Sequence, residues 1–522
     1  MRLHGAFAPC HAVRGFAGKI QPVPHAIEID EDLNMNCEYR SCISRRAFLG
    51  AGAGFALTTL MPAWPARAAK IREYRIVAGH GRTRLVGGSH PETAVWAYNG
   101  TVPGPEIRAR QGERLRVAVE NRLDEETTVH WHGLRVPNAM DGVPHLTQKP
   151  IAPGETFVYE FDVPDAGTYW YHPHQRGSEQ VGRGLYGPLI VEEPSPIQVD
   201  RDVVWVLDDW RLLQDAQISP DFGNMMDASH NGRVGNTVTV NGRIPETFAV
   251  RSGERIRLRL TNTANARIFG LEFAGHRPLV VAYDGQPVEP HEAQGGRVIL
   301  GPAMRMDIVI DMAGTPGDRF RVTDTFYNQL AYRLLDLVYE PEPLRRRPLD
   351  TPVALAANTM PEPDPKAAKR HEIAFGGGMM GGGTMGGMMG GMMDGMMGGM
   401  MGGGRMDPRG MTHNGIWTIN GVSATGHVHD PFLNLRLGGS YVLAMHNNTA
   451  WHHPIHLHGH SFRVIGRDGK PTRHREWQDT VLMSPRERVE IAFVADNPGD
   501  WMFHCHILEH QAAGMMGVIR VG

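Results

Sequence analysis

The sequence lacks an excess of charge of either sign and any long apolar run. Lys and Arg number 53 and Asp and Glu number 56 among 522 residues. This balance provides neither the basic field of a nucleic-acid-binding protein nor a polyacidic tail. A membrane anchor needs about 20 consecutive apolar residues, and the apolar stretch near the N-terminus, residues 51–60, is shorter. We therefore expect small partners, no nucleic acid, and no membrane span in the mature protein.

The N-terminal segment has the order of features typical of a twin-arginine export signal. The motif SRRAFLG at 44–50 precedes the apolar stretch, and Ala66–Ala68 forms an A-x-A cleavage site. We predict that residues 1–68 are a leader and signal peptide, and that the twin-arginine export machinery delivers the folded chain to the periplasm. The polar lead before Arg45 is long, so Met35 is an alternative start.

Cysteine is also scarce. Cleavage after Ala68 would remove Cys10, Cys37 and Cys42 and leave Cys505. The mature chain could then form no intramolecular disulfide, although its compartment is oxidising. A lone thiol there needs a chemical role, and metal ligation supplies one.

Cys505 lies in the histidine-rich stretch WMFHCHILEH. In a β-strand successive side chains point to opposite faces, so Cys505 would face one way and His504 and His506 the other. His510 follows the cysteine by five residues and Met515 by ten. A thiolate, imidazoles and a weak axial thioether are the ligands of a copper electron-transfer centre. The alternative, a buried strand with incidental histidines, does not explain three histidines around one cysteine.

Strand-like runs separated by turn signals fill the mature chain and long amphipathic helical patterns are scarce, so we predict an all-β fold. One pattern occurs three times: an Asn-Gly pair, typical of a hairpin turn, then a glycine that precedes an asparagine by nine residues. The pairs are at 99–100, 241–242 and 420–421, and the asparagines are Asn121, Asn262 and Asn447. We predict three copies of one unit, at 69–195, 196–345 and 412–522, with a Pro-rich and then Gly/Met-rich connector at 346–411. Each copy has the size of a small sandwich or Greek-key barrel.

Histidine motifs occupy equivalent positions in the first and third copies. Nine residues after the asparagine the first copy has HWHG and the third HLHG, and near their ends HPH and HCH follow a glycine by five residues. The second copy has LEFA and VTD at these places. The first and third copies are therefore predicted to bind metal, and only the third, with Cys505 where the first has Pro173, can build a thiolate centre.

These motifs are similar to those of the multicopper oxidases, a laccase-like family of three consecutive cupredoxin-like domains, which are Greek-key β-barrels or sandwiches. The resemblance covers nearly all of the mature chain and implies four copper ions. It implies a type 1 copper held by His453, Cys505 and His510 with Met515 axial, and a type 2 copper held by His130 and His456. It implies a type 3 pair held by His132, His172, His174, His458, His504 and His506. In such an enzyme electrons pass from the type 1 centre through His504 and His506 to a trinuclear cluster between the first and third domains, which reduces O2 to water.

Two carboxylates match the proton-relay positions of that family. Asp141 follows His132 by nine residues, and Glu509 precedes His510. We predict that both carry protons. Asp141 is also followed by Gly142, so a role as a turn former is the alternative.

The connector from Phe375 to Met411 is almost wholly Gly and Met. Glycine at this density should be mobile, and thioether sulfur is a soft ligand that selects Cu(I). The feature resembles the methionine-rich insertion of bacterial cuprous oxidases of the copper-efflux and copper-resistance type. The alternative is a low-complexity linker whose methionines have no role.

The predicted function is that of an exported, monomeric multicopper oxidase that oxidises Cu(I) with O2 as acceptor and serves copper tolerance. Two alternatives remain open. One is a general laccase-like oxidase of phenols or Mn(II). The other, which the complete ligand set disfavours, is a non-catalytic copper-sequestering or envelope scaffold protein.

Overall fold

The computed structural model describes residues 70–379, 415–424, 426 and 428–522. The predicted leader and signal peptide and the Gly/Met-rich run at 380–411 lie outside the described residues. Within the described part of the chain, none of the helices has the length and hydropathy of a membrane span.

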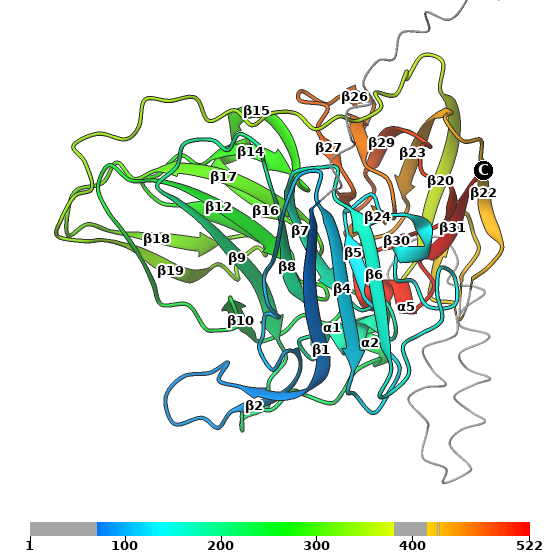
Figure 1. Ribbon diagram of the computed structural model, residues 1–522, viewed down its shortest axis with the longest axis horizontal. Coiled ribbons are helices and arrows are strands. Elements are labelled where there is room, and N and C mark those ends of the chain that lie inside the picture. Colours follow the sequence, from blue (N-terminus) through cyan, green and yellow to red (C-terminus); the bar gives the residue numbers. More distant parts are fainter. Residues whose placement is uncertain (1–69, 380–414, 425, 427) are drawn as a thin grey trace, which may run out of the picture. The chain divides into compact units, whose positions relative to one another are not determined.

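Strands are the main secondary structure of the described chain, and the helices that connect them are short (Figure 1). Strand β4 (Arg114–Asn121) shows the reason. Leu115, Val117 and Val119 are fully buried and alternate with the less buried Arg116, Ala118 and Glu120, as expected of a strand with one face on a core. The prediction of an all-β fold is confirmed.

The first copy is a pair of sheets around a core that includes Trp131 and Tyr159. One sheet has the order β2 (Thr93–Tyr98), β1 (Ile71–Thr83), β4 and β6 (Thr156–Asp162), and the other has the order β3 (Ile107–Arg110), β8 (Gly187–Glu192), β7 (Gly167–His172) and β5 (His130–His132). The 3-10 helix η1 (Asn138–Met140) follows β5, and the helix α1 (Gly177–Gly182) follows β7.

The second copy, green in Figure 1, has its own core around Trp205 and Phe269. Its sheets have the orders β10 (Thr237–Val240), β9 (Arg201–Trp210), β12 (Arg255–Asn262), β17 (Arg305–Asp311), β14 (Leu279–Tyr283), β15 (Gln286–Glu292), and β11 (Thr247–Val250), β19 (Tyr332–Tyr339), β18 (Arg319–Asp324), β13 (Phe269–Phe273), β16 (Arg297–Leu300). The helix α2 (Met225–Ser229) lies between β9 and β10, and the 3-10 helix η2 (Gln294–Gly296) precedes β16.

The third copy encloses the core that contains Cys505 and Met515. Its sheets have the orders β21 (Trp417–Ile419), β20 (Lys369–Gly377), β23 (Ser440–Asn447), β29 (Arg488–Val494), β25 (Phe462–Arg467), β26 (Lys470–Pro471), with β27 (Trp477–Gln478) also paired to β25, and β22 (Pro431–Leu435), β31 (Met516–Val521), β30 (Gly499–Cys505), β24 (His453–Leu457), β28 (Thr480–Met483). The helix α5 (Leu508–Ala512) connects β30 and β31.

The three copies share one topology. The parallel pairs β1 with β4, β9 with β12 and β20 with β23 are equivalent, as are the parallel pairs β3 with β8, β11 with β19 and β22 with β31. The Asn-Gly pairs form equivalent turns. At Asn99-Gly100 both φ angles are positive, 53° and 74°, and the other two pairs have nearly the same values. Positive φ at both central residues defines the type I′ hairpin turn, so the repeat and its turn signals are confirmed.

Strand β20 was not predicted. It lies inside the predicted connector, yet it pairs in parallel with β23 from Lys369 opposite Tyr441 to Phe375 opposite Asn447. The third sheet pair therefore begins in sequence before the Gly/Met-rich run and resumes after it.

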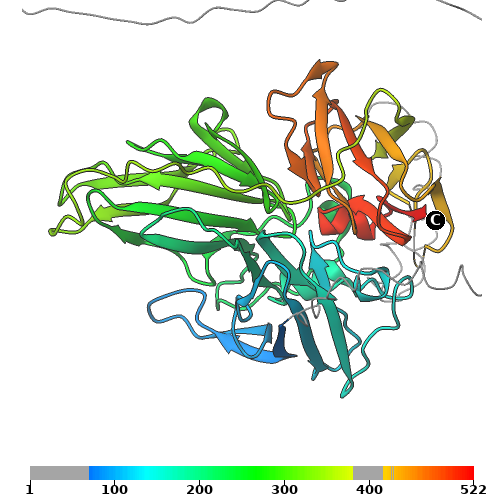
Figure 2. The same cartoon turned by 45° about the horizontal axis from the view of Figure 1, so that its top comes forward.

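The copies meet at helix α5, which contacts α1 of the first copy and α2 of the second. In Figure 2 this red helix lies where the cyan, green and orange parts converge. Apolar packing holds α5 against the other copies, because Leu508 of α5 belongs to an apolar cluster shared by the first and second copies. Ala228 of α2 belongs in turn to the core of the third.

Candidate metal centre

The histidine motifs lie on paired strands. Strand β5 pairs with β7, so that His130 is opposite His172. Strand β24 pairs with β30, so that His456 is opposite His504. Each motif in the first copy is thus held against another motif of that copy, and the third copy does the same.

The asparagine of each repeat holds the turn that leads to these strands. Asn447 Nδ2 donates to the carbonyls of Trp451 and Ser484 at 2.7 and 2.8 Å, and its Oδ1 accepts from the Thr449 amide at 3.0 Å. Asn121 and Asn262 make the equivalent bonds in their copies. Because the turn has the same geometry in every copy, the residue nine positions after the asparagine lies at the same place in each fold. That residue is a histidine in the first and third copies and Leu271 in the second.

Imidazole groups from the first and third copies converge in three buried sets. In each set the potential ligand atoms lie within 4.8 Å of one another. The sets are His130, His132 and His456; His132, His172 and His506; and His174, His458 and His504. The Nε2 atoms of His458 and His504 are 3.0 Å apart, and those of His172 and His506 are 3.4 Å apart.

The outward-facing ring nitrogens of these histidines are held by hydrogen bonds. His130 Nδ1 donates to the Asp141 carbonyl at 2.8 Å, and His456 Nδ1 donates to the Asp479 carbonyl at 2.8 Å. His458 Nδ1 donates to Asp141 Oδ2 at 2.9 Å. Such bonds fix the tautomer and leave the other ring nitrogen with a free lone pair.

The inward-facing nitrogens fit metal ions. Among the described residues, Nε2 of His130, His174 and His456 and Nδ1 of His132 are buried without a hydrogen-bond partner. Buried polar atoms are normally paired, and lone pairs aimed at one another repel. A set of cations at these positions would satisfy all of them, and imidazole is a good ligand for copper.

A fourth set contains the thiol. His453 Nδ1 is 3.4 Å from Cys505 Sγ, and His510 Nδ1 is 3.8 Å from the same sulfur. All three residues are fully buried. Met515 is buried in the same core, and its backbone bonds to both Cys505 and His510 at 3.0 Å. Cys505 belongs to this set while His504 and His506 belong to others, as the strand alternation predicts.

Comparisons with known proteins agree with this arrangement. Family models described as multicopper oxidase match residues 82–196, 201–332 and 404–522. The multicopper oxidase MmcO of Mycobacterium tuberculosis is 34% identical over 530 aligned residues, which cover 90% of this chain and 95% of that protein. The chain belongs to the multicopper oxidase family.

Two further relatives extend the comparison. Copper resistance protein A of Pseudomonas syringae pv. tomato is 29% identical to this multicopper oxidase, over 81% of this chain and 89% of the relative. The crystal structure of a multi-copper oxidase from Pseudomonas thermotolerans superposes with a TM-score of 0.75 at 33% identity, covering 87% of this chain and all of that one. The predicted cupredoxin-like fold is therefore confirmed. Membership of the family makes the protein a copper-dependent oxidoreductase that uses O2.

Burial sets the protonation of the clustered histidines of this multicopper oxidase. Loss of hydration lowers the pKa of His174, His458 and His504 well below the usual value, and the neighbouring imidazoles lower it further. Burial lowers the pKa of His510 to about 3. These rings are neutral at physiological pH and available as ligands. Burial raises the pKa of the Cys505 thiol, so a metal ion is needed to hold it as thiolate.

Asp141 joins two of the histidine sets. Its carboxylate is fully buried, accepts from His458 and lies 3.2 Å from His130 Nδ1. Asp141 also ends η1 and is followed by Gly142 at φ 82°, which is the turn position that the alternative prediction describes. The two roles are compatible, because the turn aims the carboxylate at the histidines.

Glu509 lies on α5 and faces the second copy. Its Oε1 accepts from Asn265 Nδ2 at 2.9 Å and its Oε2 from the Arg233 amide at 3.0 Å. Burial raises the pKa of Glu509, and these two hydrogen bonds oppose the rise. A carboxyl group whose pKa lies closer to neutrality is suited to proton transfer.

Sequence reasoning missed a buried ion pair beside the histidines. Arg305 of the second copy binds both oxygens of Asp479, at 2.8 and 2.5 Å. Asp479 Oδ1 in turn accepts from His132 Nε2 at 3.2 Å. Burial opposes ionisation of this carboxyl, but Arg305 holds the pKa of Asp479 below its usual value. No local pattern marks Arg305, because its partner is 174 residues away.

Proposed function

We propose that this multicopper oxidase oxidises Cu(I) to Cu(II) and reduces O2 to water. Four Cu(I) ions, one O2 and four protons would give four Cu(II) ions and two waters. The observation that carries the proposal is the position of the two described flanks of the Gly/Met-rich run, which both lie beside the set that contains Cys505.

The first flank ends at Met379. Its amide donates to the Ser229 carbonyl at 3.0 Å, and its carbonyl accepts from Trp451 Nε1 at 3.1 Å. The second flank begins at Gly415 and leads to Trp417, whose ring centroid is 4.2 Å from that of His510 and 5.1 Å from that of His453. A hydrogen bond of 3.1 Å between the Gly378 amide and the Ile416 carbonyl holds the flanks together.

This placement supports a role for the methionines in handling substrate. Thioethers select Cu(I) among biological metal ions, and a linker with no role would not need to start and finish at the electron-accepting site. The name of one relative, copper resistance protein A, is consistent with a cuprous substrate.

We assign the ligand sets by their fit to the family. His453, Cys505 and His510 would hold a type 1 copper with Met515 as the axial ligand, and His130 and His456 a type 2 copper. The six remaining predicted histidines would hold a type 3 pair. These ions, when bound, supply four one-electron centres, which match the four electrons that O2 needs.

The residues of the chain then have separate tasks. Cys505 is bonded through the backbone to His504 and His506, which provides a short covalent path between the thiolate set and the imidazole sets. Asp141 orients His458 and can hold a proton at Oδ2. Glu509 can hold a proton near α5. Burial of the sets excludes bulk water, which limits the escape of partly reduced oxygen.

The test compares two full-length variants of the copper-loaded mature protein. In one, every methionine at 380–411 is replaced by leucine. In the control, the glycines of the same run are replaced by serine and every methionine is kept. Oxygen consumption is measured with Cu(I) and, separately, with a phenol. We expect the leucine variant to lose most of its Cu(I) rate and keep its phenol rate, and the serine variant to keep both.

Equal Cu(I) rates in the two variants would contradict the proposal. The run would then be a linker, and the general laccase-like function would take its place.

We also propose export to the periplasm by the twin-arginine machinery. Replacing Arg45 and Arg46 together by lysine should leave the precursor inside the cytoplasm, as measured by cell fractionation. Export of that variant at the wild-type level would exclude this route.

A further inference from the structure

A loop of the second copy covers the ring of His510. We call residues 219–236 the covering loop; it contains helix α2 and lies between β9 and β10. The carbonyl oxygen of His230 accepts a hydrogen bond of 2.7 Å from His510 Nε2. The carbonyl of Ala228 accepts one of 2.6 Å from Trp417 Nε1, beside the same ring.

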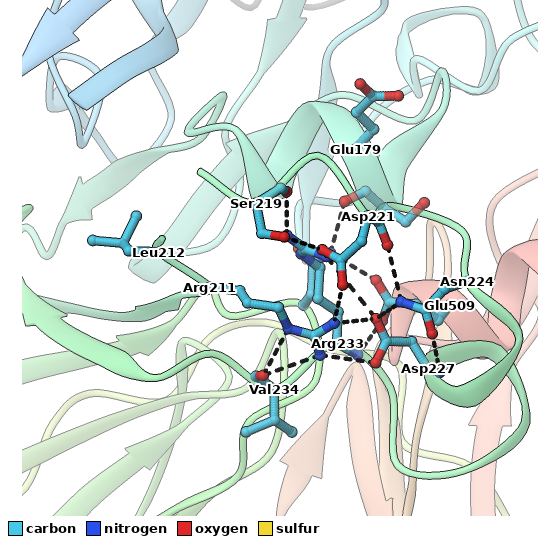
Figure 3. Close-up of polar contacts among 12 residues, drawn as sticks. Glu179, Arg211, Leu212, Ser219, Asp221, Asn224, Asp227, Arg233, Val234 and Glu509 are labelled. Atoms are coloured by element: carbon cyan, nitrogen blue, oxygen red, sulfur yellow. Dashed lines mark hydrogen bonds and ion pairs between the residues drawn. The ribbon is translucent and has the colours of Figure 1, made fainter. Parts of the chain in front are cut away.

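An ionic cluster inside the second copy holds this loop in place. Arg211 directly follows β9 and lies outside the covering loop. It binds both oxygens of Asp227 at 2.7 and 2.8 Å and Asp221 Oδ2 at 3.0 Å. Arg233 binds Asp221 Oδ1 at 2.6 Å. Figure 3 shows the two arginines and the two aspartates gathered around one point, with Glu509 beside them.

Two of the four charged side chains of the cluster are buried. The side chains of Arg233 and Asp227 are 5% and 9% exposed, and charged groups with so little solvent keep strong mutual attraction. Asn224 adds a cap to α2, since its Oδ1 accepts from the Asp227 amide at 2.9 Å. The loop thus reaches the third copy as a preformed element.

Two consequences follow for His510. With its Nε2–H donated to His230, its Nδ1 is the free nitrogen, and Nδ1 is the atom that faces Cys505. The ring edge is also inaccessible, because His510 is 0% exposed. An organic reductant cannot hydrogen-bond to this ring unless the loop moves.

We propose that the covering loop is a positioning and specificity-determining element of the electron-accepting site. It orients His510 through the His230 carbonyl, and it requires electrons to enter through that hydrogen bond instead of through direct contact with the ring. A metal ion can give up its electron from the loop surface, whereas a phenol loses the close contact that it needs. This preference for a metal ion over a phenol rests on the proposed function. The donor loses one electron per step, as Cu(I) becoming Cu(II), and O2 is the final oxidant.

Gly232 provides a specific test. It has φ +80°, and a Cβ added there would lie 2.5 Å from Ala266 Cβ and 2.5 Å from Ile507 Cγ2. Gly232→Ala must therefore displace the loop from its packing against Ala266 of the second copy and Ile507 of the third. Gly154 is a matched control, because it has φ +83° and an added Cβ would meet nothing within 4 Å. Gly154→Ala has the same backbone strain without the displacement.

Asp221→Asn is a milder variant that tests the same proposal if Gly232→Ala does not fold. Asp221 has a side chain that is 44% exposed, and it pairs with both arginines of the cluster. Asp221→Asn should loosen the loop without a steric clash.

The measurements use copper-loaded full-length mature protein. For Gly232→Ala we expect kcat/KM for a phenol to rise on the order of tenfold relative to Gly154→Ala, and the visible absorption and paramagnetic resonance signals of the thiolate–copper centre to change. Asp221→Asn should change both in the same direction by a smaller amount. The Cu(I) rate should not rise in either variant.

The proposal is overturned if Gly232→Ala and Asp221→Asn match Gly154→Ala in both spectrum and phenol kcat/KM. If the wild-type protein fails to oxidise Cu(I), the proposed function fails. The spectrum and the phenol measurement still decide the role of the loop in that case.

Discussion

At the scale of single residues, two buried carboxylates, Asp141 and Asp208, have contacts from which we predict effects on turnover and on pH response. Asp141 has no exposed surface and serves two histidines from different copies. Asp208, in the second copy, is 6% exposed and accepts a hydrogen bond of 2.5 Å from the Tyr186 hydroxyl. The first is expected to affect turnover and the second stability.

Asp141→Asn keeps the size of the side chain and an acceptor for His458, but it removes the ionisable group. We expect oxygen consumption to fall by about 100-fold while the copper content stays the same, as measured with an oxygen electrode and by metal analysis. Asp124→Asn is the control, because the Asp124 side chain is 96% exposed. An unchanged rate in Asp141→Asn would remove this residue from the proton route.

Asp208→Asn tests a pH-dependent contribution to stability. Burial, together with the charge of Asp209, raises the pKa of Asp208 to about 8, whereas an aspartate in an unfolded chain has a pKa of about 4. Between these values the folded state keeps a proton that the unfolded chain has released, so this contribution is complete below pH about 4 and is lost as the pH rises to about 8.

The side chain of the asparagine variant cannot ionise, so the variant should not lose this contribution to stability as the pH rises. We expect its free energy of unfolding to gain on that of the wild type by up to about 1 kcal/mol per pH unit across that window, measured by denaturant unfolding at a series of pH values. Glu342→Gln, at an exposed position, should track the wild type. Parallel curves for Asp208→Asn and wild type would contradict the prediction.

At the scale of elements, one strand-to-strand turn recurs in all three copies but leads to clustered histidines in only two. Asn262 and Asn447 are buried to the same degree and make equivalent hydrogen bonds. The turn after Asn447 leads through Thr449, whose hydroxyl is 2.8 Å from His453 Nε2. The turn after Asn262 leads to no ligand.

Asn262→Ala and Asn447→Ala separate stability from site geometry. Each leaves buried carbonyl groups without a donor, at a cost of about 2–3 kcal/mol, and we expect both variants to lower the free energy of unfolding by similar amounts. Only Asn447→Ala should alter the visible absorption of the copper-loaded protein. An equal spectral change in Asn262→Ala would show that the effect comes from general loosening.

At the scale of the whole molecule, the three copies are joined by polar contacts as well as by apolar packing. The imidazole sets take histidines from the first and third copies. The second copy contributes Arg305 to Asp479 and the covering loop to His510. Although it has no predicted ligand, the second copy contacts residues of both parts of the candidate metal centre.

Removal of copper should therefore weaken the association between the first and third copies. Ions bound at 1,000 times their dissociation constant stabilise a fold by about 4 kcal/mol, and calorimetry of chelator-treated protein should show unfolding several degrees lower, with recovery when copper is restored. The same treatment of a His174→Ala, His458→Ala double variant should produce a smaller shift. Identical thermograms with and without copper would show that apolar packing alone joins the copies.

The sequence by itself determined the all-β fold, the threefold repeat and every histidine and cysteine that the structure gathers into ligand sets. These features are local: an Asn-Gly pair specifies its own turn, and strand alternation alone separates Cys505 from His504 and His506. The first histidine motif follows Asn121 and Asn447 by the same number of residues, so the positions of the histidines in one copy predicted those in the other.

Only the tertiary structure decided what surrounds those ligands. Strand β20 escaped prediction because its parallel partner β23 lies about 70 residues away, beyond the Gly/Met-rich run. The bond from His510 to His230 joins residues 280 apart, and the Arg305–Asp479 pair joins residues 174 apart. Contacts between distant residues depend on how the copies pack and not on any local pattern, so the residues that position the ligands became visible only in the folded chain.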